Sequence, residues 1–404
     1  MATEKMYELA FQFKGARLWQ QLFDDEVFAV RLSDGEIGYC SVMGRLGEHL
    51  ALGLYVGNEG YQSYRLMLDA DHDAVDDIEM GFLLTAQSCL QCSFENKDML
   101  SEEELEETRQ YAQAHGKQLR GRNAFPQFTK YRPGRFPWRY DSDVDEQRIC
   151  DALSAAIALK KILRQHSKEE LGLISLRANA RKIPMLAWEN DRWVTKYTEL
   201  PSSEMVYPEP LFTNEVLAAR LKRKKKAGVW ECGTMRIPTA IQAEGGEEEA
   251  PYYPLALIYV ELETELVFSP IVTVGEGAAE MMNDFAEQLL DGDSLPRTIY
   301  CGDDRCFSLL KDFCGKTGIR IERTDAPELL DEVMQDLLEH MGEDENGEPD
   351  FEQMDEMFDT LMLMTDGELK QMPREMANMM YSLAEAGELP EQLATRIKKL
   401  FRRK

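Results

Sequence analysis

The chain lacks the features that would place it in a membrane or a secretory pathway. Its 404 residues contain no run of about 18 apolar residues, so no transmembrane helix is expected. The first residues show no basic stretch followed by an apolar one, so we predict no signal peptide. From these absences we expect a cytoplasmic protein with no membrane partner.

Short motifs typical of common enzyme sites are also absent. The sequence contains no Walker phosphate loop, no GxSxG, no HExxH and no GxGxxG. Its five histidines are dispersed, without the spacing of metal ligands. The sequence therefore predicts no cofactor.

The chain has eight cysteines, and several of them lie inside apolar runs. Such cysteines are typical of small buried side chains with reduced thiols. Cys89 and Cys92 form a lone CxxC, whereas a zinc site needs four ligands. We interpret this pair as part of a strand, with a metal or redox site as the alternative.

Charge is plentiful but unevenly distributed. The formal net charge is −28, which argues against general nucleic-acid binding. Between Asp325 and Leu369 there are 17 acidic residues and no lysine or arginine. Between Glu107 and Asp141 there is no acidic residue. These two stretches are candidate interaction surfaces because each carries charge of one sign.

Residues 1–200 are predicted to form an α+β domain with an antiparallel sheet. Short apolar runs between turn signals indicate strands, and longer amphipathic runs indicate helices. After an opening helix, the expected strands span residues 27–32, 37–43, 50–56, 90–94, 171–176, 183–188 and 193–197, and the expected helices span 60–68, 76–84, 101–115 and 145–166. Ser101 and Glu104 form a capping-box pattern at the start of the helix over 101–115.

Residues 211–341 are predicted to form an α/β domain, since their hydrophobic pattern switches repeatedly between strand and helix. A helix over 214–226 and a strand over 229–237 introduce it. The expected strands that follow span residues 254–260, 266–274, 298–301 and 319–321, and the expected helices span 277–290, 307–314 and 328–340. A hairpin followed by alternating helices and strands fits an RNase H-like or related fold.

Residues 342–404 are predicted to form an acidic, Met-rich helical tail. Its methionines include Met354, Met357, Met362 and Met364. Flexible apolar side chains of this kind suit an adaptable protein-binding groove. We therefore predict a protein partner at the tail; the alternative is a small helical core that closes on the α/β domain.

Parts of the chain resemble a bacterial family of unknown function. The resemblance is carried by residues 32–57, which begin Leu-Ser-Asp-Gly-Glu-Ile-Gly-Tyr-Cys, by 123–128 (Asn-Ala-Phe-Pro-Gln-Phe) and by 131–138 (Tyr-Arg-Pro-Gly-Arg-Phe-Pro-Trp). Residues 211–340 resemble a second uncharacterised domain that often follows the first. The resemblance implies two tandem domains and assigns no catalytic residue. Some relatives end in a Cys/His zinc-binding motif, whereas this chain ends in the Met-rich tail.

Four carboxylates are candidates for a catalytic metal site in the α/β domain. Nucleases of the RNase H-like fold hold two metal ions with acids on strands and helices that converge. The corresponding regions here offer Glu261, Glu280, Asp303 and Asp325. Because acidic residues are common throughout this chain, an alternative interpretation is that Asp303 only caps a helix.

Arg120–Tyr140 is a candidate ligand-binding segment. It interleaves arginines with aromatic residues, a combination suited to phosphate contact and ring stacking, and three prolines favour an extended path. The residues predicted to bind are Arg132, Arg135, Arg139, Trp138 and Phe128. The alternative is a packed loop whose arginines pair with surface carboxylates.

The sequence as a whole favours a non-enzymatic interaction protein. The alternative is a protein that acts on nucleic acid through a metal-dependent, nuclease-type α/β domain.

Overall fold

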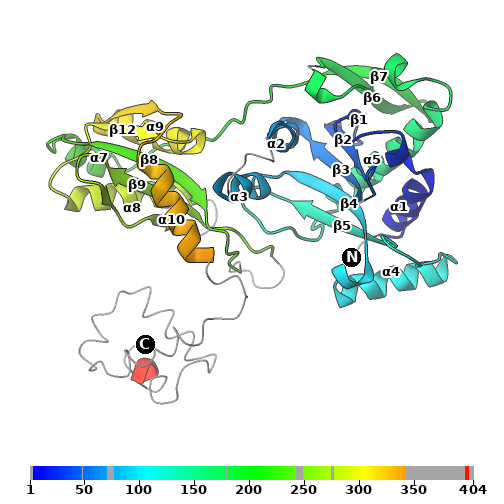
Figure 1. Ribbon diagram of the computed structural model, residues 1–404, viewed down its shortest axis with the longest axis horizontal. Helices are drawn as coiled ribbons and strands as arrows, with labels where there is room; N and C mark the ends of the chain where they lie inside the picture. The colour runs from blue at the N-terminus through cyan, green and yellow to red at the C-terminus, as the bar shows by residue number, and fades with distance from the viewer. Residues whose placement is uncertain are drawn as a thin grey trace. The chain divides into compact units, whose positions relative to one another are not determined.

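The computed structural model describes residues 3–47, 49–70, 77–178, 180–242, 249–273, 277–342 and 396–399. The chain separates into two compact units, Met1–Gln335 and Asp336–Lys404. Both sheets belong to the first unit (Figure 1). The predicted tail falls outside the described residues, except for Gly342 and a helical turn over 396–399.

A seven-stranded sheet occupies the N-terminal half of the first unit. Its strand order is β5-β4-β3-β2-β1-β6-β7. The strands are β1 (Phe28–Arg31), β2 (Ile37–Met43), β3 (Leu50–Val56), β4 (Cys89–Glu95), β5 (Phe125–Tyr131), β6 (Lys182–Glu189) and β7 (Arg192–Glu199). All neighbours are antiparallel except β1 and β6, which run parallel.

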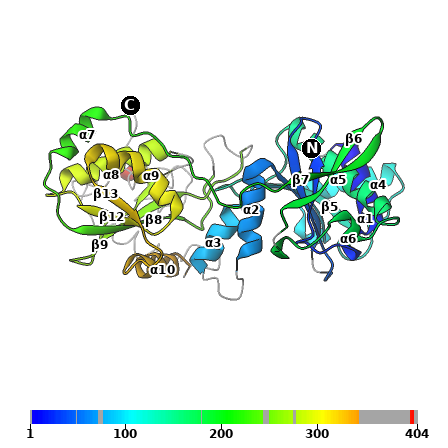
Figure 2. The ribbon, with the colours of Figure 1, turned by 90° about the horizontal axis from the view of Figure 1, so that it is seen from above.

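Helices cover both faces of this sheet. They are α1 (Glu4–Ala16), α2 (Gly57–Asp69), α4 (Glu102–Ala114), α5 (Asp143–Ile162) and α6 (Lys168–Leu171), with short 3-10 turns at Leu18–Gln20, Lys97–Met99 and Leu176–Ala178. Helix α3 (Asp77–Thr85) instead contacts β8, a strand of the second sheet (Val229–Arg236). Figures 1 and 2 show α1 and α5 on one face and α2 on the other. Alternation along β2 explains this, because Cys40 and Val42 join the core under α1 and α5 while Tyr39 joins the core under α2.

Helix α2 follows β3 without a loop. Gly57 begins the helix with φ +64°, a conformation that residues with a side chain rarely adopt. Gly60, one turn into α2, lies directly against the backbone of Tyr55. These two glycines allow α2 to fold back onto the strand that precedes it.

A second sheet forms in the α/β domain. Its strand order is β10-β9-β8-β12-β13, and β11 also pairs with β9. The strands are β8 (Val229–Arg236), β9 (Leu255–Glu261), β10 (Leu266–Val267), β11 (Ile271–Thr273), β12 (Thr298–Cys301) and β13 (Arg320–Arg323). Strands β8 and β9 are antiparallel, while β8, β12 and β13 are parallel, so their carboxyl ends share one edge.

The helices of this domain are α7 (Glu215–Lys222), α8 (Ala278–Asp291), α9 (Asp304–Thr317) and α10 (Leu330–Gly342). Phe285 of α8 and Phe313 of α9 are fully buried in one core with Tyr259 of β9. Figure 2 shows α8 and α9 on one face of the sheet and α10 on the opposite face. The central strand β8 is therefore covered from both sides.

Two sequence expectations about the first domain need correction. Residues 171–176, predicted as a strand, instead end α6 and lead into a 3-10 turn. The capping box of Ser167 and Glu170 starts α6, and Gly172 ends it with φ +72°. The sheet is also not wholly antiparallel, because the long helix α5 lies between β1 and β6 in the sequence and allows them to pair in parallel.

The cysteine expectation leads to a direct test. All eight cysteines are free and buried. Burial raises the pKa of the Cys89 thiol to about 12, so almost no thiolate forms near neutral pH. We expect a thiol reagent at pH 8 to label the native chain slowly and the denatured chain at once. Rapid labelling of any cysteine in the native chain would contradict the structure around that residue.

Candidate functional site

The four predicted carboxylates lie at different places in the α/β domain. Glu261 ends β9 opposite Trp230, near the start of β8. Asp303 instead binds Thr234, four residues further along β8, which corresponds to about 13 Å of strand. Thr264 donates its hydroxyl and its amide to Glu261, and these bonds lower the pKa of this carboxyl. The structure therefore separates Glu261 from Asp303.

The other two predicted acids are exposed. Glu280 lies in the first turn of α8, where a negative charge stabilises the helix dipole. Asp325 lies in the loop between β13 and α10. Asp325 shares the carboxyl edge of the parallel strands with Asp303, but Glu280 follows an antiparallel strand.

Asp303 is the N-cap of α9, as its sequence position suggested. Its carboxylate accepts a hydrogen bond from the amide of Cys306 at 2.7 Å. It also accepts bonds from the amide and the hydroxyl of Thr234, at 2.7 and 2.8 Å. This single carboxylate therefore joins α9 to the central strand β8.

Glu231 is a further carboxylate in this region and is not among the four acids predicted from the sequence. It lies in the middle of β8 and is only 2% exposed. Its oxygens accept hydrogen bonds from the amides of Glu328, Leu329 and Leu330, at 2.7, 3.0 and 3.0 Å. The signal was one acidic residue inside the apolar run Val229–Met235, where an unpaired charge would be costly.

Glu231 lies on β8, and Asp303 lies just after the end of the neighbouring strand β12. Glu231 is paired with Tyr300 in the register of β8 and β12, and Asp303 follows two residues after β12 ends. A side chain added at Gly233 would meet Leu330 at 2.8 Å, so α10 packs closely over this face. A carboxylate offers about four lone-pair positions. The carboxylates of Glu231 and Asp303 each already accept three hydrogen bonds. Within the described part of the chain, no group of three or more His, Cys, Asp or Glu side chains is arranged to hold a metal ion.

The predicted arginines of the Arg120–Tyr140 segment make separate contacts. Arg132 pairs with Asp141 at 3.2 Å, and the exposed Arg139 pairs with Glu103 at 3.7 Å. Arg135 donates to the carbonyl of Ala250 at 3.2 Å and lies over the ring of Tyr252.

The predicted aromatic residues differ in exposure. Phe128 is a core residue on β5 with 8% of its surface exposed. Trp138 is half-buried, and its indole Nε1 is buried with no hydrogen-bond partner among the described residues. Phe128 and Arg139 line a common cavity of about 70 Å³. The acidic residues that line it are Glu103, Glu104, Glu107 and Glu146. These acids would repel a phosphate, so ligand binding by this segment stays a prediction.

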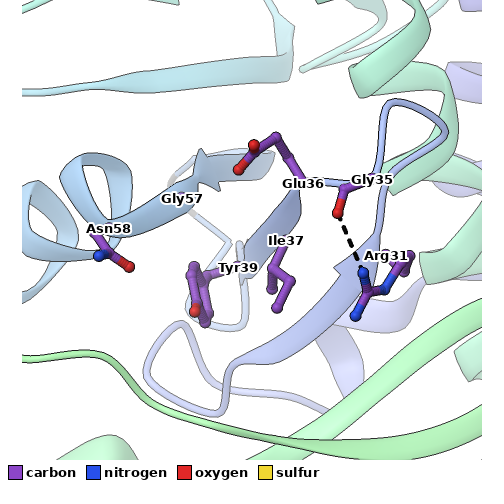
Figure 3. A pocket seen from close by; sticks show the side chains of 7 residues that line it. All are labelled: Arg31, Gly35, Glu36, Ile37, Tyr39, Gly57 and Asn58. Atoms are coloured by element: carbon purple, nitrogen blue, oxygen red, sulfur yellow. Dashed lines mark hydrogen bonds between the residues drawn. The ribbon is translucent and has the colours of Figure 1, made fainter.

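A pocket of about 400 Å³ lies at the N-terminus of α2, within the region that resembles the family signature (Figure 3). Arg31, Glu36, Tyr39 and Asn58 supply its polar side chains. Tyr39 is 4% exposed, and no hydrogen bond of its hydroxyl is found in the described structure. Burial raises the pKa of Tyr39, so this hydroxyl remains a proton donor at neutral pH.

The electrostatics of the α2 pocket are mixed. Val56, the N-cap of α2, has no side-chain oxygen to accept the first amides of the helix. Arg31 is held by a hydrogen bond to the carbonyl of Gly35 at 3.2 Å (Figure 3). The Glu36 carboxylate lies 3.7 Å from the position that a Cβ on Gly57 would take, so it offsets the positive helix end. This arrangement suits a polar ligand that carries both donors and acceptors.

A second, larger pocket lies further along α2. It measures about 920 Å³ and is lined in part by Tyr61, Arg65, Arg181 and Lys182. Arg65 is bound to Asp69 at 2.7 Å, and Lys182 pairs with Glu199 at 3.5 Å. The rings of Tyr39 and Tyr61 pack 4.9 Å apart, so the walls of the two α2 pockets touch.

Comparisons with known proteins agree with the tandem organisation. Residues 4–173 match the family model described as Domain of unknown function (DUF7309), and residues 217–338 match Domain of unknown function (DUF6930). No curated protein matches the chain. Among solved structures it is similar to the HTLV-2 integrase catalytic core domain in complex with magnesium (trimeric form). The identity is 13%, the match covers 44% of this chain and 83% of that one, and the TM-score is 0.19, too low to support a functional argument. The chain therefore carries two domains of unknown function in tandem, DUF7309 followed by DUF6930.

Proposed function

We propose that this chain is a non-enzymatic binding protein. In this proposal the α/β domain has an RNase H-like fold whose strand carboxylates support the structure rather than a catalytic metal. The N-terminal domain would supply a ligand site along α2. Most of the tail lies outside the described residues, so its protein partner stays a prediction.

The strand order supports the RNase H-like assignment. Three antiparallel strands come first, and two strands parallel to the first of them follow, in the order β10-β9-β8-β12-β13. Helix α8 follows β10 and β11, α9 follows β12, and α10 follows β13. In nucleases of this fold, the first strand and the end of the fourth carry metal-binding acids. Glu231 and Asp303 occupy these two regions here.

The observation that carries the proposal is the use of these two carboxylates as hydrogen-bond acceptors. Glu231 accepts hydrogen bonds from three backbone amides at the start of α10. Asp303 accepts one from a backbone amide at the start of α9 and two from Thr234. Two metal ions would need several free oxygens from the same side chains. Metal binding would therefore have to displace contacts that hold two helices to the sheet.

Support for ligand binding comes from the N-terminal domain. The α2 pocket combines a guanidinium, a carboxylate, an amide and the hydroxyl of Tyr39. Convergent polar groups of this kind at the rim of a concave surface are typical of small-molecule sites.

The second candidate function is a metal-dependent nuclease. It is favoured by the strand order and by the location of Glu231 on β8 and of Asp303 just after the adjacent strand β12. An α10 that moves away on substrate binding would free the oxygens of Glu231.

Nuclease assays and thermal-shift measurements on the full chain separate these functions. With Mg²⁺ or Mn²⁺, we expect no cleavage of labelled DNA, RNA or RNA–DNA hybrids above the level of the Glu231→Gln and Asp303→Asn variants. The thermal-shift measurements should also include polar small molecules, because a ligand at 100 times its Kd adds about 2.7 kcal/mol to the free energy of unfolding. Stabilisation that Tyr39→Phe removes would locate the ligand at α2. Metal-dependent cleavage that both carboxylate variants lose while still folded would replace the proposal with the nuclease function.

A further inference from the structure

Strand β7 has a free edge. It is the last strand in the order of the seven-stranded sheet, and among the described residues only β6 pairs with it. Trp188 on β6 and Tyr197 on β7 are 55% and 54% exposed. Long exposed strand edges with aromatic side chains are templates for pairing with another strand.

The hairpin geometry shows which backbone groups point outward from β7. Asn190 and Asp191 have φ of 49° and 60°, which identifies a two-residue turn of type I′ between β6 and β7. Such a turn makes Glu189 and Arg192 a hydrogen-bonded pair, and bonded pairs alternate from there. The amide of Leu200 donates to the carbonyl of Arg181 at 3.0 Å, which agrees with this alternation.

It follows that every second residue of β7 forms backbone hydrogen bonds with β6, while the backbone groups of the residues between them do not. Val194, Lys196 and Thr198 bond to β6. The amides and carbonyls of Trp193, Thr195 and Tyr197 point away from the sheet. These are the groups that a further antiparallel strand would need.

We propose that a second copy of this chain occupies this edge, with its β7 antiparallel to the first across a two-fold axis at Thr195. This proposal goes beyond the binding function above and does not depend on it. The two copies would form one continuous sheet. Trp193 of each copy would form backbone hydrogen bonds with Tyr197 of the other copy. The two Thr195 residues would form backbone hydrogen bonds with each other.

Charge selects this register among the neighbouring ones. A two-fold axis perpendicular to the sheet pairs side chains on the same face, so registers shift by two residues. One neighbouring register places Arg192 opposite Lys196 of the second copy, and the other places Lys196 opposite itself. The proposed register places Val194 opposite Lys196, whose charge already pairs with Glu189. Its one like-charged pair is Asp191 with Glu199; Asp191 lies in the turn outside β7, and Glu199 already pairs with Lys182. Like charges directly opposite each other destabilise a strand pair, so the proposed register is the favoured one.

The side chains of this register also complement each other. Trp188 and Trp193 already form an edge-to-face pair, with ring centroids 5.5 Å apart. The second copy would add its Tyr197 beside Trp193 and so extend the aromatic row on one face. Aromatic pairs across strands stabilise a sheet, and this pair would cover the exposed ring of Tyr197.

The interface consists of one strand from each copy, so we expect a weak and reversible dimer. Sedimentation velocity of the full chain between about 1 and 200 µM should show a shift from monomer to dimer, as small interfaces give. Thr195→Pro should raise the dimer Kd about thirtyfold, because it removes one outward amide from each copy. Bonds within the hairpin should remain, since β6 does not use this amide.

Two further variants keep the experiment decisive. Thr195→Val retains the amide and should dimerise like the natural chain. Tyr197→Glu replaces an exposed side chain, should fold normally, and should weaken the dimer by at least about tenfold. A natural chain that stays monomeric up to about 200 µM, or a dimer that survives both Thr195→Pro and Tyr197→Glu, would overturn the proposal.

Discussion

Replacing Glu231 by alanine is expected to lower the free energy of unfolding by about 3 kcal/mol or more. The substitution removes a buried carboxylate and leaves the amides of Glu328, Leu329 and Leu330 without their acceptor. Hydrogen bonds to a charged group contribute more than neutral ones, and α10 would lose its attachment to β8. Urea denaturation followed by circular dichroism measures the loss.

Hydrogen exchange localises the effect of this substitution. We expect faster exchange at the amides of residues 328–330 in Glu231→Ala, and an intermediate effect in Glu231→Gln, which keeps one carbonyl oxygen. Glu280→Ala is the matched control, because this exposed acid should change stability by no more than about 0.5 kcal/mol. A Glu231→Ala chain as stable as the natural one would contradict a structural role for Glu231 and favour the nuclease function.

The fold was predictable wherever the local pattern decides it. Turn residues and apolar runs placed β2 and β3 within the bounds observed, and Ser101 with Glu104 marked the start of α4. Strand β5 was not predicted, because Pro126 and the arginines that follow obscure its alternation. The parallel pairing of β1 with β6 depends on long-range packing, which no local pattern contains.

The candidate site was less predictable than the fold. The hydrophobic pattern indicates a hairpin after Pro254 as the start of the sheet and therefore favours Glu261 as the strand acid. In the structure the central strand is β8, so the buried strand acid is Glu231. For Asp303, the alternative interpretation as a helix cap is confirmed, since the end of a strand followed by a helix start is a local pattern. The α2 pocket collects residues from β1, β2 and α2, and its geometry follows only from the fold.

Replacing Gly60 by alanine is expected to destabilise the N-terminal domain by about 3 kcal/mol. An alanine Cβ at this position would lie 2.6 Å from the carbonyl carbon of Tyr55 and 3.0 Å from its Cα. Backbone atoms cannot move aside as a flexible side chain can, so α2 would have to shift away from β3. That shift would loosen the buried contacts of Tyr61 and Tyr64 with the sheet.

Gly15→Ala provides the matched control for Gly60→Ala. Gly15 also lies in a helix, α1, and an added Cβ there would meet no atom within 4 Å. Alanine favours the helix, so this variant should be more stable than the natural chain by about 0.5 to 1 kcal/mol. Because the N-terminus of α2 forms one wall of the α2 pocket, Gly60→Ala should also remove any ligand stabilisation that depends on Tyr39. Equal stability of the two variants would show that α2 does not pack against Tyr55 as closely as the structure indicates.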